Sequence, residues 1–271
     1  PVPFSSTVYL AAEAIMALGT EAQKQAWLPK FAEGTAIGCF AMGEAGGRVT
    51  PDQMSTRMQD GVLNGTKVPV ADGGIADVAI VVCASDKGDG ATLALVDLSQ
   101  DAVSKDNVQM IDFSRGHSEL VFDGACAEML GEEGAGWTAV ESLMNTAAVL
   151  FAWEQIGIAD KALEQAREYA LGRFAFGRSI ASYQAIKHKL AKMYVKNTLA
   201  RSNAYYGAWA LNAKASDLAV ASATSRVAAI QASLFSAEAH IPTHGGLGFP
   251  LEFDCQFYYR PATLLRLAVG R

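Results

Sequence analysis

The chain has 271 residues, of which 51% are hydrophobic and 18% are charged. This composition is that of an ordinary globular protein and excludes an intrinsically disordered one. The net charge of −6 argues against a dedicated nucleic-acid-binding protein. No run of about twenty uninterrupted apolar residues occurs, so the sequence predicts no membrane span, and no segment resembles a signal peptide.

The four cysteines, Cys39, Cys83, Cys126 and Cys255, are scattered along the chain. They form no C-x-x-C pair, and no histidine accompanies them at the spacing of a metal motif, so the sequence indicates no metal centre. Four cysteines in a chain of this length do not make a disulfide framework. We expect small buried thiols in a reducing compartment, and therefore a cytoplasmic protein.

Residues 1–35 are predicted to be helical. Ser5 and Ser6 are candidate caps for a first helix, which Gly19 can end. Thr20 would cap a second helix, because Gln23 stands at the capping-box position three residues later.

Residues 36–128 have the texture of a β-domain. Short apolar runs are separated by Gly, Asp, Asn and Ser, which is typical of antiparallel strands and their turns. The predicted strands lie in the runs AIGCFAM, GVLNGTKVPV, VAIVVCA, TLALVDL, VQMIDF and LVFDG. Within the second run, Asn64-Gly65 has apolar flanks and predicts a hairpin turn.

Residues 129–271 return to helical periodicity. We expect one long helix over about 140–175, a second over about 182–213, and a third that Ser216 or Asp217 would cap. A Gly-rich break follows, and a short last helix would begin near Pro261. The basic side chains concentrate in this part of the chain, which would suit an anionic ligand as well as a solvated helix face.

The order of helices, strands and again helices predicts an α+β fold with segregated elements and disfavours a parallel Rossmann sheet. Neither of the two standard Gly-rich phosphate loops occurs. The most informative stretch is 173–186, where an Arg, an aromatic residue and a Gly turn precede a new helix. Its residues alone fit either a plain helical corner or a site for a diphosphate, which an Arg can bind in bidentate fashion.

That stretch carries the pattern R-x-x-F-G-x-x-I-x-x-x-Q-A-I-x-x-x-L-A-x-M, which resembles the signature of the acyl-CoA dehydrogenases. The resemblance extends to the segments LGTEAQKQAWLPKFAEG, CFAMGEAGG, LNGTKVPVADGGIADVAIVVCA and IPTHGGLGFPLEFDCQFYYR. It implies remnant N-terminal helices, a middle antiparallel β-barrel domain and a C-terminal four-helix bundle. The match begins at the family's last N-terminal helix, so we expect the earlier helices either to form a disordered or separate domain or to be absent from a shortened subunit.

The resemblance also implies FAD as cofactor and an acyl-CoA thioester as substrate. The family's reaction removes an α-proton with a carboxylate and transfers the β-hydrogen to flavin as hydride. Arg173 and Phe176 match an Arg and a Phe that reach the FAD of a neighbouring subunit. Gln184 matches a glutamine near the same cofactor, and Gly245 and Gly246 match a diglycine beside its diphosphate.

The positions that match the family's catalytic base are inert. Many members have a glutamate where this chain has Val269, and another group has one where this chain has Ala147. Glu154 lies seven residues beyond Ala147, which is about two helical turns and about 10 Å along the axis. It is a weak candidate for the base, and a partnered carboxylate between helices is the alternative. The catalytic residue therefore stays unassigned.

Several flavin-ring contacts of the family are also missing. Gly43, Pro69, Ala71 and Pro242 stand where the family has polar or aromatic side chains, and Gly46-Gly47-Arg48 lacks a clear counterpart of the family's serine. This pattern resembles the degenerate subunit of the heterotetrameric, sterol-side-chain type of acyl-CoA dehydrogenase, in which an unlike subunit completes an α2β2 enzyme. A self-sufficient homotetramer and a non-catalytic assembly subunit are the alternatives. Electron-transfer flavoprotein is the usual acceptor in the family.

Overall fold

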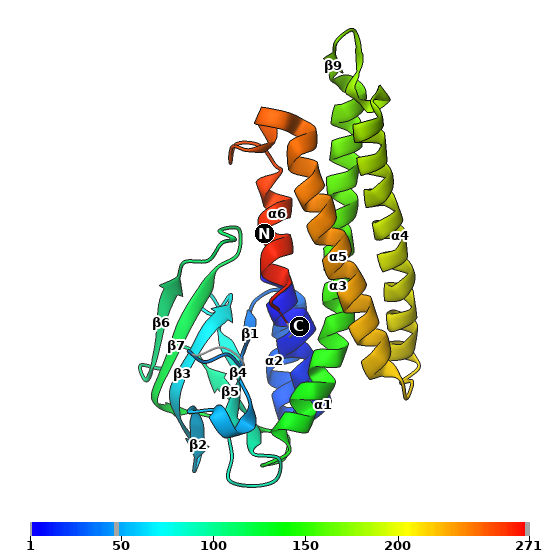
Figure 1. The fold of residues 1–271 in the computed structure, drawn as a ribbon. Coiled ribbons are helices and arrows are strands. Elements are labelled where there is room, and N and C mark those ends of the chain that lie inside the picture. Colours follow the sequence, from blue (N-terminus) through cyan, green and yellow to red (C-terminus); the bar gives the residue numbers. More distant parts are fainter. Residues whose placement is uncertain (1, 46–48, 269–271) are drawn as a thin grey trace. The chain divides into compact units, whose positions relative to one another are not determined.

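The computed structural model describes residues 2–45 and 49–268. Their packing divides the chain into two compact units, and the boundary follows Leu143. Figure 1 labels the helices and strands of both units. Each unit is described by itself below. The finer division into three domains, at residues 35 and 128, stays a prediction.

The N-terminal segment is helical, as predicted, and consists of η1 (Ser5–Ala12), α1 (Glu13–Leu18) and α2 (Glu21–Glu33). Thr20 and Gln23 form the predicted capping box, in which each side chain accepts a hydrogen bond from the other residue's backbone N–H, at 3.3 and 3.0 Å. The predicted caps at Ser5 and Ser6 are wrong. Both serines lie inside η1, a π-helical segment, and the Ser6 hydroxyl donates to the Asp72 carboxylate instead.

Eight strands form one sheet. They are β1 (Gly38–Ala41), β2 (Arg57–Gln59), β3 (Val62–Ala71), β4 (Val78–Ala84), β5 (Ala91–Asp97), β6 (Val103–Val108), β7 (His117–Cys126) and β8 (Glu128–Leu130). The hydrogen-bonded order is β6-β7-β3-β2-β4-β5-β8, and β1 pairs with β4. Within the described residues no ladder joins the two ends of this path, so the sheet is open and the predicted closed barrel is not found. The pairings are antiparallel except for β1 with β4 and β2 with β4, which are parallel.

The hairpin predicted at Asn64-Gly65 is wrong, because β3 runs straight through both residues. The turn lies at Asp60-Gly61, where both residues have positive φ and connect β2 to β3. Gly65 has another role: a Cβ there would lie 2.6 Å from the Thr56 Cα, so glycine permits the close approach of the chain. Asp-Gly and Asn-Gly are both strong turn signals, and the pairing of β3 with β2 and β7 places the turn at Asp60-Gly61.

The strand predicted in the run VQMIDF is also wrong. Strand β6 ends at Val108, and the apolar Ile111 and Phe113 lie in the following loop with about half of their surface exposed. The more polar segment VSKDNV forms β6 instead, because it is an edge strand with one partner, β7. Edge strands need less apolar sequence than central ones, which a count of hydrophobic residues does not capture.

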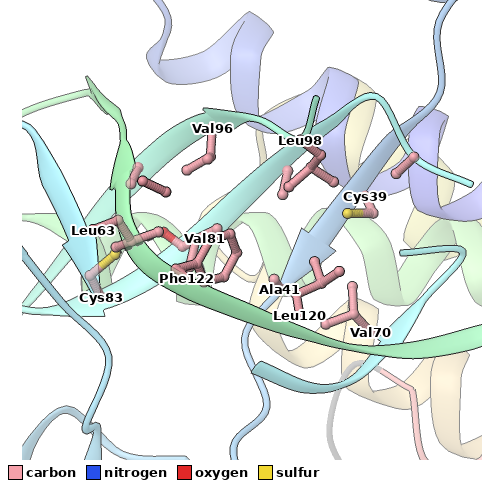
Figure 2. Packing of buried hydrophobic residues seen from close by; sticks show 14 residues of the cluster. Cys39, Ala41, Leu63, Val70, Val81, Cys83, Val96, Leu98, Leu120 and Phe122 are labelled. Carbon is pink, nitrogen blue, oxygen red and sulfur yellow. Dashed lines mark hydrogen bonds between the residues drawn. The ribbon is translucent and has the colours of Figure 1, made fainter. Parts of the chain in front are cut away.

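The core of the first unit lies within this sheet (Figure 2). Strand β4 is buried at every position, which explains its uninterrupted apolar sequence. The residues labelled in Figure 2 come from β1, β3, β4, β5 and β7, with Leu98 directly after β5, and include Val81, Leu120 and Phe122. Cys39 and Cys83 belong to this cluster as free thiols, and burial raises the pKa of each to about 12. They are small buried side chains, as expected.

The second unit consists mainly of helices. These are α3 (Gly136–Gly172, whose first residues belong to the first unit), α4 (Gln184–Asn212), α5 (Leu218–His244) and the short α6 (Gln256–Leu265). The three long helices are confirmed, whereas α6 begins before Pro261, which lies inside it. The shared core of α3, α4 and α5 consists mainly of alanines. Because these side chains are small, the helix backbones can approach one another closely. Whether these helices constitute the family's four-helix bundle stays a prediction.

By length and hydropathy alone, one stretch, Leu218–Gly248, could cross a membrane. It comprises α5 and the short η4 (Gly245–Gly248). The inner face of α5 packs on α4 and carries the buried polar residues Ser233, Ser236 and His240. Such contacts are those of a core helix.

Candidate functional site

The turn between α3 and α4 is a small hairpin, which Figure 1 shows at one end of the helices. Strands β9 (Phe174–Ala175) and β10 (Arg178–Ser179) pair in antiparallel fashion, and Phe176 and Gly177 form the two-residue loop. Both loop residues have positive φ, +52° and +79°, as a type I′ turn requires. A bulky aromatic residue is unusual in this conformation. Phe176 is nevertheless 98% exposed, so its ring gains no packing against the described residues in return.

The base of this hairpin is held rigidly. The Ser179 hydroxyl donates to the Ala170 carbonyl at 2.7 Å, at the end of α3. The Tyr183 hydroxyl donates to the Ala175 carbonyl at 2.9 Å, and the Arg178 guanidinium lies 3.9 Å above the Tyr183 ring. The exposed aromatic tip is therefore presented on a fixed support, which is what a binding element needs.

Arg173 and Gln184 flank the hairpin on its two helical sides. The Arg173 backbone is fixed, because its N–H donates to the Tyr169 carbonyl and its carbonyl accepts from the Ile180 N–H, both at 2.8 Å. The side chains of Arg173 and Gln184 are exposed. Gln184 is the first residue of α4, where an amide can meet a polar ligand. Their assignment to a cofactor stays a prediction.

Gly245 and Gly246 follow the end of α5. Gly245 has φ +62° and ψ −136°, a conformation that is accessible essentially only to glycine. Both residues are exposed, and a Cβ built on either would point into open space. The neighbouring His244 ring packs 4.3 Å from the Tyr169 ring, one turn before Arg173. The diglycine and the hairpin therefore lie at the same end of the helical unit.

In the β-domain, two of the departures from the family pattern meet. A Cβ on Gly43 would lie 3.0 Å from the Val68 carbonyl oxygen and 3.8 Å from the Pro69 Cδ, and the Val68 N–H donates to the Gly43 carbonyl at 2.9 Å. The Val68–Pro69 peptide bond is cis. The missing side chain at Gly43 and the proline at position 69 are thus one local feature of the structure. Residues 46–48, which lack a clear counterpart of the family's serine, lie outside the described residues.

The loop after Gly43 is fastened by a buried ion pair. Lys67 Nζ lies 2.8 Å from Glu44 Oε1, and the Lys67 side chain is fully buried. Glu44 also accepts hydrogen bonds from Ser55 and from the Thr56 N–H. Burial opposes ionisation of Glu44, but these donors together with Lys67 hold its pKa at about 2. For Lys67, burial outweighs the pair and lowers the pKa.

The positions of the family's base offer no proton acceptor in the described residues. Ala147 is fully buried in α3, and Val269 lies outside the part of the chain that the structure describes. Glu154 is half-buried on α3, and its charge acts on Arg226, which is buried within the second unit. This interaction favours the alternative that Glu154 is a partnered carboxylate between helices.

Phe176→Asn tests whether the backbone of the hairpin tip is strained. The substitution creates an Asn-Gly turn, the preferred sequence for positive φ at both positions, and removes an exposed aromatic ring. We expect the isolated chain to become more stable, by about 0.5–1 kcal/mol, as measured by chemical denaturation. A loss of stability would contradict the strain inferred from the φ of Phe176.

The structure also brings together three residues that the sequence did not associate. His240 and His244 lie one turn apart on α5, and Cys255 immediately precedes α6. Their ligand atoms all lie within 4.8 Å of one another, and all three side chains are buried. Burial and the neighbouring His244 lower the pKa of His240 to about 4, and burial raises the pKa of Cys255 to about 11. The i, i+4 spacing of the histidines was visible in the sequence, but the position of Cys255 depends on the fold.

Comparison with known proteins agrees with this architecture. Residues 134–271 match the family model described as acyl-CoA dehydrogenase, C-terminal domain. A short-chain specific acyl-CoA dehydrogenase from Megasphaera elsdenii is 31% identical over 99% of this chain and 73% of its own length.

Solved structures are similar over nearly the whole chain. Butyryl-CoA dehydrogenase from Megasphaera elsdenii has a TM-score of 0.90 at 28% identity and covers 99% of this chain and 73% of its own. The Tcur3481-Tcur3483 steroid ACAD has a TM-score of 0.87 at 25% identity and covers 100% of this chain and 73% of its own.

Proposed function

The chain belongs to the acyl-CoA dehydrogenase family, and on that premise we propose that it is an FAD-binding subunit of an enzyme that dehydrogenates an acyl-CoA thioester between its α and β carbons. We further propose that an unlike subunit supplies the catalytic base. The observation that carries the proposal is the hairpin tip. Phe176 is held in an unfavourable backbone conformation and exposed beside Arg173, which is accounted for if a ligand on another subunit covers it.

The described residues fit an FAD at this end of the helical unit. The exposed guanidinium of Arg173 can bind an anionic diphosphate through two parallel hydrogen bonds. Gly245 and Gly246 leave open the space that a Cβ would fill, so their backbone can approach phosphate oxygens. Gln184 would meet a polar group at the start of α4. When bound, the flavin supplies the acceptor for the β-hydrogen, as it does in the family.

This chain's own residues orient and shield, and they do not remove the α-proton. Ala147 cannot accept a proton, and the charge of Glu154 acts on Arg226. Abstraction of the α-proton needs a carboxylate within hydrogen-bonding reach, with a pKa raised towards neutrality by burial. We therefore assign that carboxylate to the partner.

Assembly with another subunit is supported by an apolar face on α4 and α5. Large side chains that are about half exposed or more follow one another along it: Tyr194, Val195, Leu199, Tyr205, Tyr206, Trp209, Val220 and Val227. Large apolar side chains exposed in such number on two neighbouring helices are typical of an interface. An unlike subunit, in an α2β2 enzyme, fits this face together with the missing base. The similarity to a structure named as a steroid ACAD favours a bulky acyl group.

Two alternatives remain in the same family. A self-sufficient homotetramer would use the same apolar face but would need a base of its own. A non-catalytic subunit would bind flavin or acyl-CoA for assembly only. We propose electron-transfer flavoprotein as the acceptor, in line with the family, and a cytoplasmic location, in line with four free cysteines.

The test compares the chain alone with the chain co-expressed with the family member that the neighbouring reading frame encodes. For each sample, the visible spectrum measures bound flavin, and an assay measures turnover of an acyl-CoA. We expect flavin retention and acyl-CoA oxidation only in the co-purified complex. Turnover with stoichiometric flavin by the chain alone would overturn the unlike-subunit proposal. Flavin retention without turnover in the complex would favour the non-catalytic alternative.

A further inference from the structure

The cluster of His240, His244 and Cys255 lies directly beside the diglycine in the chain and carries an inference of its own. The three side chains are 0%, 4% and 0% exposed, so two imidazoles and a thiol have been removed from water together. Buried polar atoms normally have hydrogen-bond partners. Within the part of the chain that the structure describes, the Cys255 Sγ meets the His240 Nε2, at 3.6 Å. Such a distance is at most a weak hydrogen bond.

That distance is the one that a shared zinc ion requires. Bonds of about 2.3 Å to sulfur and about 2.0–2.1 Å to nitrogen, at a tetrahedral angle, separate the two ligand atoms by about 3.6 Å. The His244 ring satisfies a second requirement. Its Nδ1 lies 3.0 Å from the His240 carbonyl oxygen, so a proton on Nδ1 is hydrogen-bonded and Nε2 keeps its lone pair for a ligand bond.

The surroundings are those of a metal site. Aromatic rings enclose the imidazoles: Tyr169 and Phe253 pack against His244 at 4.3 and 5.0 Å, and Tyr258 packs against His240 at 5.5 Å. An apolar shell of this kind limits access of water to a bound ion.

A cavity of about 450 Å³ opens on His244 and provides a path for entry. Its wall contains three carboxylates, Glu168, Glu252 and Asp254, which attract a cation. The same cavity can supply a water molecule as the fourth ligand.

We infer that His240, His244 and Cys255 bind a divalent cation of the zinc class. Two imidazoles and one thiolate suit a borderline-soft ion and do not suit Mg²⁺ or Ca²⁺, which prefer oxygen ligands. On binding, the Cys255 thiol loses its proton to solvent and its sulfur donates an electron pair to the ion. The two neutral imidazoles donate lone pairs, and no group is oxidised or reduced. The ion joins the end of α5 to the start of α6 and closes the segment that contains Gly245 and Gly246.

The inference is tested on the full-length purified chain, stripped with a chelator and dialysed against Zn²⁺. Metal analysis is expected to give about one Zn²⁺ per chain, and X-ray absorption a shell of one sulfur and two or more light ligands at the distances given above. Cys255→Ala and His244→Gln are expected to weaken binding by about 100-fold or more. Binding of Zn²⁺ should raise the melting temperature of the unsubstituted chain and leave that of Cys255→Ala unchanged.

Matched controls lie elsewhere on the same chain. Cys126→Ser and His188→Gln remove an exposed thiol and an exposed imidazole, and should leave Zn²⁺ binding unaltered. Failure of the unsubstituted chain to bind Zn²⁺, a ligand shell without sulfur, or loss of binding in Cys126→Ser would each overturn the inference. These readouts do not involve flavin or turnover, so their failure is distinguishable from that of the proposed function.

Discussion

Lys67→Met is expected to destabilise the first unit by about 3–5 kcal/mol. Lys67 is fully buried and lies 2.8 Å from Glu44 Oε1, and its Nζ also donates to the Met42 carbonyl at 3.2 Å. Removing the ammonium leaves the Glu44 carboxylate partly buried and without its counter-charge. The measurement is the midpoint of urea denaturation, followed by circular dichroism, for the substituted and unsubstituted chains.

A double substitution and an exposed pair serve as controls for Lys67→Met. Lys67→Met with Glu44→Gln removes both charges and should recover much of the lost stability, because no uncompensated charge remains. Lys87→Met breaks an exposed pair, in which Lys87 Nζ lies 2.7 Å from Glu133, and should shift the midpoint little. Equal losses from Lys67→Met and Lys87→Met would show that burial does not govern the strength of the pair.

Local sequence signals predicted the helices well and the sheet less well. The capping box at Thr20 and the three long helices depend on residues close together in sequence, so periodicity and capping rules suffice for them. The pairing of β1 and β2 with β4 joins distant segments in parallel, which no local pattern encodes. The choice of Asp60-Gly61 over Asn64-Gly65 for the turn likewise depends on the register with β7.

The candidate site likewise contains local features that the sequence predicted and contacts that it did not. The hairpin at 174–179 is local, so the sequence located it, although it did not reveal that Phe176 would be strained and fully exposed. The meeting of Gly43 with Pro69, and that of Cys255 with the two histidines of α5, require the tertiary fold. When cysteines and histidines lie on different elements, their spacing in the sequence therefore does not show whether they come together in the fold.

Arg173→Ala is expected to lower the affinity of the assembled complex for FAD by about 10- to 100-fold. Charge-assisted hydrogen bonds to a diphosphate contribute about 1.5–3 kcal/mol, which corresponds to that range. The side chain is exposed, and the backbone of residue 173 is held by hydrogen bonds to Tyr169 and Ile180 that alanine keeps, so the substitution should leave the fold intact. The measurement is the ratio of flavin to protein absorbance after gel filtration, followed by titration of the stripped complex with FAD.

Arg167→Ala is the matched control, because Arg167 is an exposed arginine of α3 less than two turns before Arg173. It removes the same charge near the same end of α3 and should leave flavin occupancy unchanged. Arg173→Lys keeps the charge but loses the planar fork, so an intermediate affinity would identify bidentate recognition as the basis of the effect. Full occupancy in Arg173→Ala would refute the cofactor role of this residue. Equal losses in Arg167→Ala and Arg173→Ala would instead indicate that only the general positive charge of α3 attracts the flavin.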